Sequence, residues 1–153
     1  MQDSIERSID LAAPIDRVWR AVSDHVEFGQ WFRTKVAAPF AVGARVHCQC
    51  LYPGLEHLTW DMTILEITPP TRFVYSWPAY YGEDDPVPPG TPDLQVAFHL
   101  MPHGAGTRLT ITESGFAALP PDKAPTAFRL NTQGWDEQIN NISAHVLGPH
   151  AGA

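Results

Sequence analysis

The stretch TAFRLNTQGWDEQINNISAHVL, residues 126–147, decides the fold of this chain. In its second part the apolar residues recur at steps of four, three and four positions, which is the spacing of one face of an α-helix. These residues are Trp135, Ile139, Ile142 and Val146. The pattern predicts one long C-terminal helix with a single apolar stripe. Gly134 lies inside this helix and costs about 1 kcal/mol relative to alanine, so we expect another element to approach closely there.

Segments that alternate apolar and polar residues occupy much of the chain ahead of this helix. They are SIERSIDL (4–11), ARVHCQCLY (44–52), LTWDMTILEI (58–67), TRFVYSW (71–77), DLQVAFHLM (93–101) and TRLTITES (107–114). A period of two predicts half-buried strands. Turns between successive segments predict an antiparallel sheet with one apolar face. The apolar phase shifts at Leu65 and Ile67, which indicates a bulge or a covered end.

Two segments between the first strand and the others have helical spacing. AAPIDRVWRAVSD (12–24) predicts a short helix that begins near Pro14, and HVEFGQWF (25–32) predicts a second helix or turn, weakened by Gly29. An apolar sheet face needs a cover, and only the C-terminal helix has a long enough stripe. We therefore predict one α+β domain over residues 1–153, with a curved sheet of about six strands wrapped round that helix.

The composition excludes several classes of function. The 153 residues are 44% hydrophobic and 18% charged, as expected for a globular protein. A net charge of −7 with ten unclustered basic residues argues against nucleic-acid binding and against a basic membrane-binding face. No apolar run approaches the roughly 18 residues of a membrane span. The first residues lack the basic patch and apolar run of a signal peptide, which predicts a cytoplasmic protein.

No motif predicts a metal or a cofactor. Cys48 and Cys50 lie two positions apart on a strand, where they are poorly placed to form a disulfide, and we expect two buried free thiols. No glycine-rich phosphate loop or metal-binding helix is present. The histidines have no partner at a readable spacing and are expected at the surface, with His25 or His57 as the weak candidates for a cavity mouth.

Several strings in order resemble one known family. They are ERSIDLAAPIDRVWRAVSD, EFGQWF, LEITPPTRFVYSW, GTRLTITESGF and GWDEQINNI. Together, over roughly residues 4 to 147, they are similar to the homology family of the activator of heat-shock-protein ATPase. This family lies within the START and polyketide-cyclase-like (SRPBCC) superfamily. The resemblance implies the helix-grip fold, with a cavity between sheet and helix that often takes an apolar ligand. It implies no single activity.

An aromatic-rich set of side chains falls on the inward phase or in connecting segments near one end. The set is Trp31, Phe32, Tyr52, Trp60, Met62, Phe73, Tyr75, Trp77, Phe98, Phe116, Trp135 and Ile139. Alternation alone favours a filled core. The resemblance favours a cavity in which these residues bind a small apolar or aromatic ligand.

Polar candidates within this set are few. Glu113 shares the phase of the inward residues of its strand, so it is a weak candidate for catalysis together with Tyr75. The alternative for Glu113 is a strand-end carboxylate in solvent or paired with Arg7 or Arg129, and carboxylates are seldom buried. Asn131 and Gln138 flank the apolar stripe of the long helix and could reach the cavity, but we favour a solvated helix edge for both.

The stretch WPAYYGEDDPVPPGTPD, residues 77–93, joins two predicted strands of one sheet and is therefore no domain linker. Five prolines stiffen it, and such long loops are usually functional or mobile. We expect Tyr80 or Tyr81 to pack at an end of the cavity, as part of a lid, or against a partner chain. The acidic run that follows should stay solvated.

Three functions remain open. The first is a small-molecule binding protein with an apolar or aromatic cavity. The second is an enzyme of the cyclase or hydrolase type that uses the same cavity. The third is a stand-alone protein-interaction module related to the co-chaperone, which predicts an exposed apolar patch. A homodimer is compatible with each.

Overall fold

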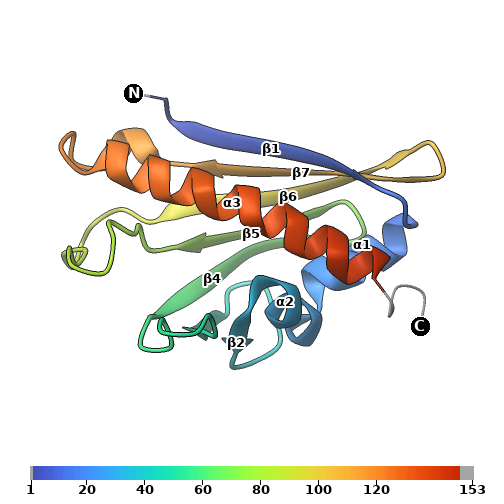
Figure 1. Cartoon of the computed structure of the whole chain (residues 1–153), viewed down its shortest axis with the longest axis horizontal. Helices are drawn as coiled ribbons and strands as arrows, with labels where there is room; N and C mark the ends of the chain where they lie inside the picture. Colours follow the sequence, from blue (N-terminus) through green and yellow to red (C-terminus); the bar gives the residue numbers. More distant parts are fainter. Residues whose placement is uncertain (1, 149–153) are drawn as a thin grey trace.

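The computed structural model describes residues 2–148 and shows a long helix lying across one face of a curved sheet (Figure 1). In chain order the elements are β1 (Ser4–Leu11), α1 (Ile15–Ser23), α2 (His25–Phe32), β2 (Thr34–Val36), β3 (Arg45–Cys50), β4 (Thr59–Thr68), β5 (Arg72–Trp77), β6 (Leu94–His103), β7 (Gly106–Ser114), the 3-10 turn η1 (Phe116–Ala118) and α3 (Ala124–Leu147). No helix within these described residues is both long and apolar enough to cross a membrane.

The sheet is antiparallel throughout, in the order β1-β7-β6-β5-β4-β3-β2. It has seven strands where the sequence predicted about six. The additional strand is β2, whose three residues pair with β3 and are too few to show a period of two. The bulge expected near Leu65 is confirmed, because the register between β4 and β5 shifts between Ile64 and Glu66.

Both short helices form where the sequence predicted them. The Asp24 carboxylate caps α2 by accepting the backbone N–H of Glu27 at 2.9 Å. Gly29 had counted against this helix, yet packing requires it, because a Cβ at this position would collide with the carbonyl oxygen of Thr34. The close approach expected at Gly134 is wrong. That glycine is exposed, and an added Cβ would meet nothing within 4 Å.

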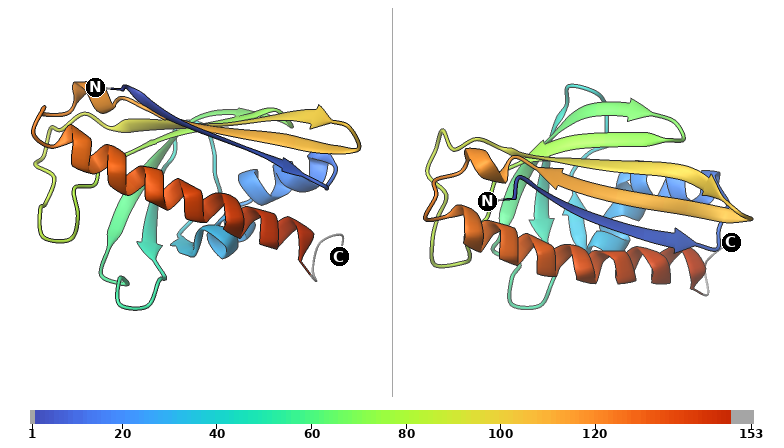
Figure 2. Two further views of the ribbon diagram at one scale, coloured as in Figure 1. Left: turned by 45° about the horizontal axis from the view of Figure 1, so that its top comes forward. Right: turned by 90° about the horizontal axis from the view of Figure 1, so that it is seen from above.

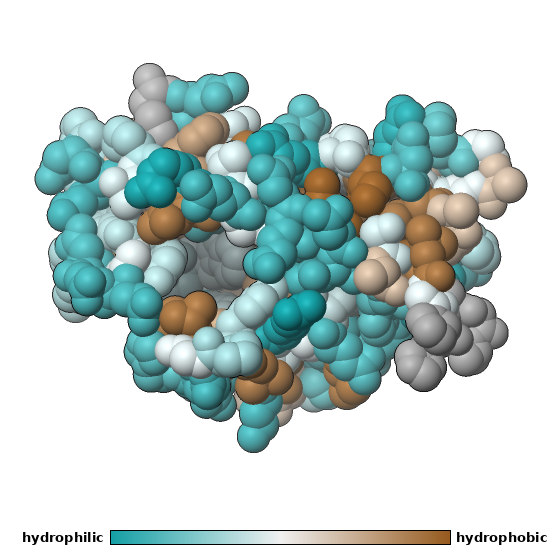
Figure 3. Space-filling view, viewed as in Figure 1, coloured by the Kyte–Doolittle hydropathy of each residue, from teal (hydrophilic) through white to brown (hydrophobic). Residues whose placement is uncertain are grey.

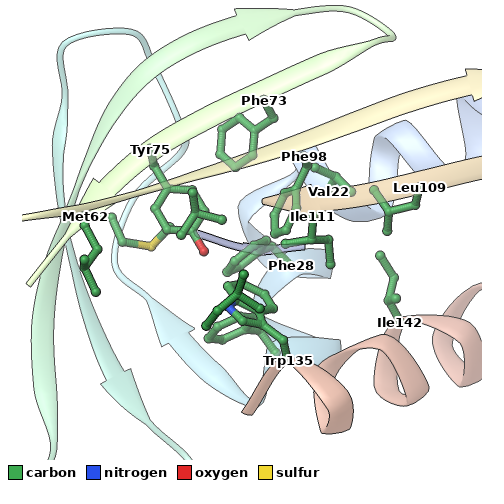
Figure 4. Close-up of a cluster of buried hydrophobic side chains, with 14 of the residues drawn as sticks. Val22, Phe28, Met62, Phe73, Tyr75, Phe98, Leu109, Ile111, Trp135 and Ile142 are labelled. Atoms are coloured by element: carbon green, nitrogen blue, oxygen red, sulfur yellow. The ribbon is translucent and has the colours of Figure 1, made fainter. Parts of the chain in front are cut away.

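The sheet curls round α3, and the turn between β3 and β4 reaches past the helix (Figure 2). Side chains from the sheet, α2 and α3 fill the space between them (Figure 4). Phe28, Phe73, Tyr75 and Phe98 are all fully buried, and their rings contact one another in stacked, tilted and edge arrangements. This arrangement confirms the helix-grip fold and shows that the centre of the molecule is a packed core.

The proline-rich loop of residues 78–93 leaves the sheet after β5 and returns as β6, the neighbouring strand. At its distal part the Lys123 ammonium meets the Asp85 carboxylate at 2.6 Å and lies 5.9 Å from the ring centroid of Tyr81. Because Lys123 directly precedes α3, these contacts hold the loop against the start of that helix.

Candidate functional site

A cavity of about 640 Å³ opens at one end of the sheet. Its walls come from the turn between β3 and β4, the end of β5, residues 78–87 of the loop, and residues 130–138 of α3. The space-filling view shows this hollow in the face that carries α3 (Figure 3). A smaller hollow of about 350 Å³ lies near the turn between β6 and β7, and its lining contains no phenylalanine, tyrosine or tryptophan. The larger cavity is therefore the candidate site.

Aromatic rings from five separate segments line the cavity. They are Phe32, Tyr52, Trp60, Trp77 and Tyr80. Trp60 and Trp77 meet edge to face with centroids 6.5 Å apart, and Phe32 lies 5.9 Å from Trp77. Such walls suit a flat apolar ligand.

Glu113 lies directly behind this wall and is fully buried. The Trp77 indole donates to its Oε2 at 2.6 Å, and the Trp135 indole donates to its Oε1 at 2.9 Å. The Asn131 amide lies 3.0 Å from both oxygens. Trp77 and Asn131 also line the cavity. The Glu113 carboxylate thus holds in place two residues of the cavity wall, Trp77 and Asn131, and also Trp135, which does not line the cavity.

Burial raises the pKa of Glu113, and the hydrogen bonds from Trp135, Trp77 and Asn131 oppose this rise without cancelling it. The alternation in β7 correctly placed Glu113 on the same face as Leu109 and Ile111. The alternative of a solvated or arginine-paired carboxylate is wrong. Arg7 instead bonds Asp136 at 2.6 Å, and the three donors that hold Glu113 are all neutral.

A polar ladder follows on the same side of α3, where a solvated edge was expected. The Gln138 side chain is buried and donates to the carbonyl oxygen of Phe32 at 3.3 Å. The Asn141 amide donates to the Gln138 oxygen at 3.1 Å and to the Tyr52 hydroxyl at 3.0 Å. The prediction of a solvated helix edge is wrong for Gln138, because the sheet curls far enough for α2 and the segment after β3 to reach this side of α3.

The predicted ligand-binding residues divide into two groups. Four line the cavity, namely Phe32, Tyr52, Trp60 and Trp77. Eight pack into the core or beside it and do not line the cavity, namely Trp31, Met62, Phe73, Tyr75, Phe98, Phe116, Trp135 and Ile139. For the residues on strands, position along the sheet decides the group. Side chains near the centre of the sheet are covered by α2 and α3, and those near the β3–β4 turn are not.

The two catalytic candidates lie in different surroundings. The Tyr75 hydroxyl is buried and has no hydrogen-bond partner among residues 2–148. Its pKa is raised well above the ordinary value, chiefly by burial and then by Glu113 and Cys48. Such a phenol holds its proton at neutral pH, so Glu113 is the better proton-transfer candidate of the two.

The predicted lid tyrosines also separate. Tyr80 is exposed and lines the cavity, whereas Tyr81 is buried and contacts Lys123 outside the lining. His57, a weak candidate for the cavity mouth, lies 3.0 Å from Glu83 on the rim, and His25 begins α2.

Sequence reasoning missed the carboxylates that line the cavity, Glu83, Asp85 and Glu137. The first two belong to an acidic run that was expected only to stay solvated, and the third lies on the helix edge beside Gly134. Polar residues in a loop carry no periodic signal, so sequence could not tell a solvated loop from a rim. Within residues 2–148, no group of three or more His, Cys, Asp or Glu side chains could hold a metal ion.

The fold and this cavity define a helix-grip protein with an opening at one end of the grip. A family model described as "Activator of Hsp90 ATPase homolog 1-like protein" matches residues 12–146, and the chain belongs to this family. No curated protein matches the chain.

Solved structures share the fold. DynU16, a putative protein in the dynemicin biosynthetic locus, is 24% identical over 97% of this chain, with a TM-score of 0.74. This chain spans only 48% of the length of DynU16. A protein from Arthrobacter aurescens superimposes with a TM-score of 0.79 at 17% identity, over 96% of this chain and 87% of its own. CalU16 from Micromonospora echinospora is 23% identical over 95% of this chain and 76% of its own, with a TM-score of 0.66.

Proposed function

We propose that this protein binds a small, largely apolar or aromatic molecule in the cavity between the β3–β4 turn, the loop 78–93 and α3. One observation carries the proposal: the cavity of about 640 Å³ is open and lined by aromatic rings, although the rest of the sheet–helix interface is packed. This volume lies in the usual range for small-molecule sites, about 300–1,000 Å³.

Gly134 offers a direct test, because it lines the cavity and a Cβ added there meets no neighbour within 4 Å. A panel of lipids and aromatic compounds is titrated against the protein, with tryptophan fluorescence as the signal and native mass spectrometry for stoichiometry. Gly134→Leu places a bulky side chain in the cavity and should weaken binding by about tenfold or more. Gly134→Ala is the matched control and should bind nearly as the parent does.

Two results would contradict the proposal. One is that no compound in the panel binds. The other is that Gly134→Leu binds every ligand as tightly as the Gly134→Ala control.

An enzyme of the cyclase or hydrolase type is a second candidate, favoured by Glu113. Its raised pKa suits a proton donor, and it accepts hydrogen bonds from Asn131 and Trp77, which both line the cavity. A ligand that displaced the Asn131 amide would reach the carboxyl group. Loss of turnover in Glu113→Gln with ligand binding retained would support this candidate.

The protein-interaction module gains less support. The large exposed apolar residues lie on separate segments; they are Val26, Val42, Leu51, Leu65, Tyr80, Met101 and Leu147. A pull-down with the heat-shock ATPase tests this function, and it should recover no complex.

A further inference from the structure

The charge of the cavity lining is one-sided. Glu83, Asp85 and Glu137 line it, and among the described residues of the chain no lysine, arginine or histidine does. A fourth carboxylate, Glu113, lies behind the wall. An apolar cleft edged by charges of one sign focuses the field and attracts the opposite charge.

Cations of the protein neutralise this charge only in part. Lys123 pairs with Asp85, and His57, which is charged only when protonated, pairs with Glu83. Glu137 forms no ion pair within residues 2–148 and lies beside the Tyr52 hydroxyl, whose pKa is raised by burial first and also by Glu137. The existing pairs are partly exposed and therefore weak.

One ring in the cavity lining and one beside it already attract cations. The Arg33 guanidinium lies 5.2 Å from the centroid of Tyr52, a lining residue, and Lys123 lies 5.9 Å from that of Tyr81. Both distances fall within the roughly 6 Å of a cation–π contact. Trp60 and Trp77 line the same space, and tryptophan is the aromatic side chain whose face binds cations best. Within residues 2–148, no lysine or arginine of the protein lies over either ring.

We propose that the natural ligand of this cavity is an organic cation, an amine or quaternary ammonium group on a flat apolar body. The aromatic wall takes the body, and the tryptophan faces with Glu83 and Glu137 take the charge. This inference rests on the proposed function of the cavity as a ligand site.

Two probes of one shape, with an anion on the same ring system, test the charge separately from the shape. They are (2-naphthylmethyl)trimethylammonium, its neutral carbon analogue 2-neopentylnaphthalene, and the anion 2-naphthylacetate. Binding is measured by fluorescence at low ionic strength. The cation should bind about tenfold more tightly than the neutral probe, and the anion most weakly. Added salt should reduce the preference for the cation.

The double variant Glu83→Gln/Glu137→Gln should remove most of that preference and leave the neutral probe unchanged. Asp84→Asn/Asp93→Asn is its matched control. It changes the net charge equally, and both residues are exposed loop positions outside the lining. The control should keep the preference to within about twofold, because neither of its two carboxylates lines the cavity.

The outcomes distinguish this inference from the function beneath it. Equal binding of the cation and the neutral probe would overturn the inference and leave the ligand site standing. Equal loss of preference in both double variants would also overturn it, because the effect would then come from net charge. Binding of none of the three probes would overturn both.

Discussion

Trp77 and Trp135 stack with ring centroids 5.8 Å apart, and each donates its indole N–H to a different oxygen of Glu113. Trp77 ends β5 and Trp135 lies on α3, so this one contact ties the sheet to the helix at the inner end of the cavity. The carboxylate makes its hydrogen bonds at the cost of desolvation, which is why its pKa is raised.

Glu113 should make stability fall as pH rises. Its folded pKa lies above the ordinary value of 4.5, so between these two values the folded state binds more protons than the unfolded state, and the free energy of unfolding decreases with pH. Below the ordinary pKa both states are protonated, so the titration of Glu113 no longer changes the free energy of unfolding with pH. Urea unfolding from about pH 4 to about pH 8 should show that the free energy of unfolding of the parent falls with pH relative to that of Glu113→Gln.

The difference between the two unfolding curves isolates Glu113. Asp10, Glu27, Asp61 and Glu66 have lowered pKa values and act in the opposite direction, but they are common to both proteins. Parallel curves would contradict the prediction.

The two cavity tryptophans should differ in what they contribute to stability. Trp77→Phe removes the donor to Glu113, and a hydrogen bond to a charged group contributes about 1.5–3 kcal/mol. Trp60 is the control, because its buried indole N–H has no partner among residues 2–148 and Trp60→Phe loses no hydrogen bond. Chemical denaturation should show Trp77→Phe to be less stable than Trp60→Phe by at least about 1 kcal/mol. Equal stabilities would show that the indole–carboxylate bond contributes little.

Glycines at two helical positions should respond oppositely to alanine. Gly134→Ala should raise the free energy of unfolding by up to about 1 kcal/mol, since the position is exposed and unhindered. Gly29→Ala should destabilise the protein, because the Thr34 carbonyl occupies the space that the new Cβ needs. Thermal unfolding of both variants checks the signs. A destabilised Gly134→Ala, or a stabilised Gly29→Ala, would contradict this packing.

These two glycines mark how far sequence could predict the fold. Periodicity located the helices that contain these glycines, α2 and α3, and all the longer strands, because an apolar stripe and an alternating strand are local patterns. It could not say which glycine touches a neighbour, because the neighbour of Gly29 is the three-residue strand β2, which has no pattern of its own. The close contact that the sequence predicts at Gly134 is therefore found at Gly29 instead.

The candidate site shows the same division. Strand phase placed Glu113 inward, and this is confirmed. The phase could not name its partners, because the donors come from two other elements, β5 for the Trp77 indole and α3 for the Trp135 indole and the Asn131 amide. Because carboxylates are seldom buried, a solvated Glu113 was the more general expectation. The three hydrogen-bond donors that surround Glu113 in the folded protein make its burial possible.

Lys123 should hold the loop 78–93 without stabilising the whole protein. Its ion pair with Asp85 is partly exposed, so Lys123→Ala should change the free energy of unfolding by less than about 1 kcal/mol. Hydrogen exchange of the loop amides should nevertheless become faster, because the contacts to Asp85 and Tyr81 are lost. Lys35→Ala on the exposed face of β2 is the control and should leave loop exchange unchanged. An unchanged loop in Lys123→Ala would mean that the prolines alone order it.

The two buried thiols should react at different rates. Burial raises the pKa of Cys48 to about 12, and its Sγ lies 3.4 Å from the Met62 sulfur inside the core. Cys50 is buried too but lines the cavity, so reagents reach it from there. Maleimide at about pH 8 should label Cys50 alone in the native protein and both thiols after unfolding. Peptide mass spectrometry locates the label, and Cys50→Ser should abolish native labelling. A cavity ligand should slow the labelling of Cys50, and fast labelling of Cys48 in the native state would contradict the packing around Met62.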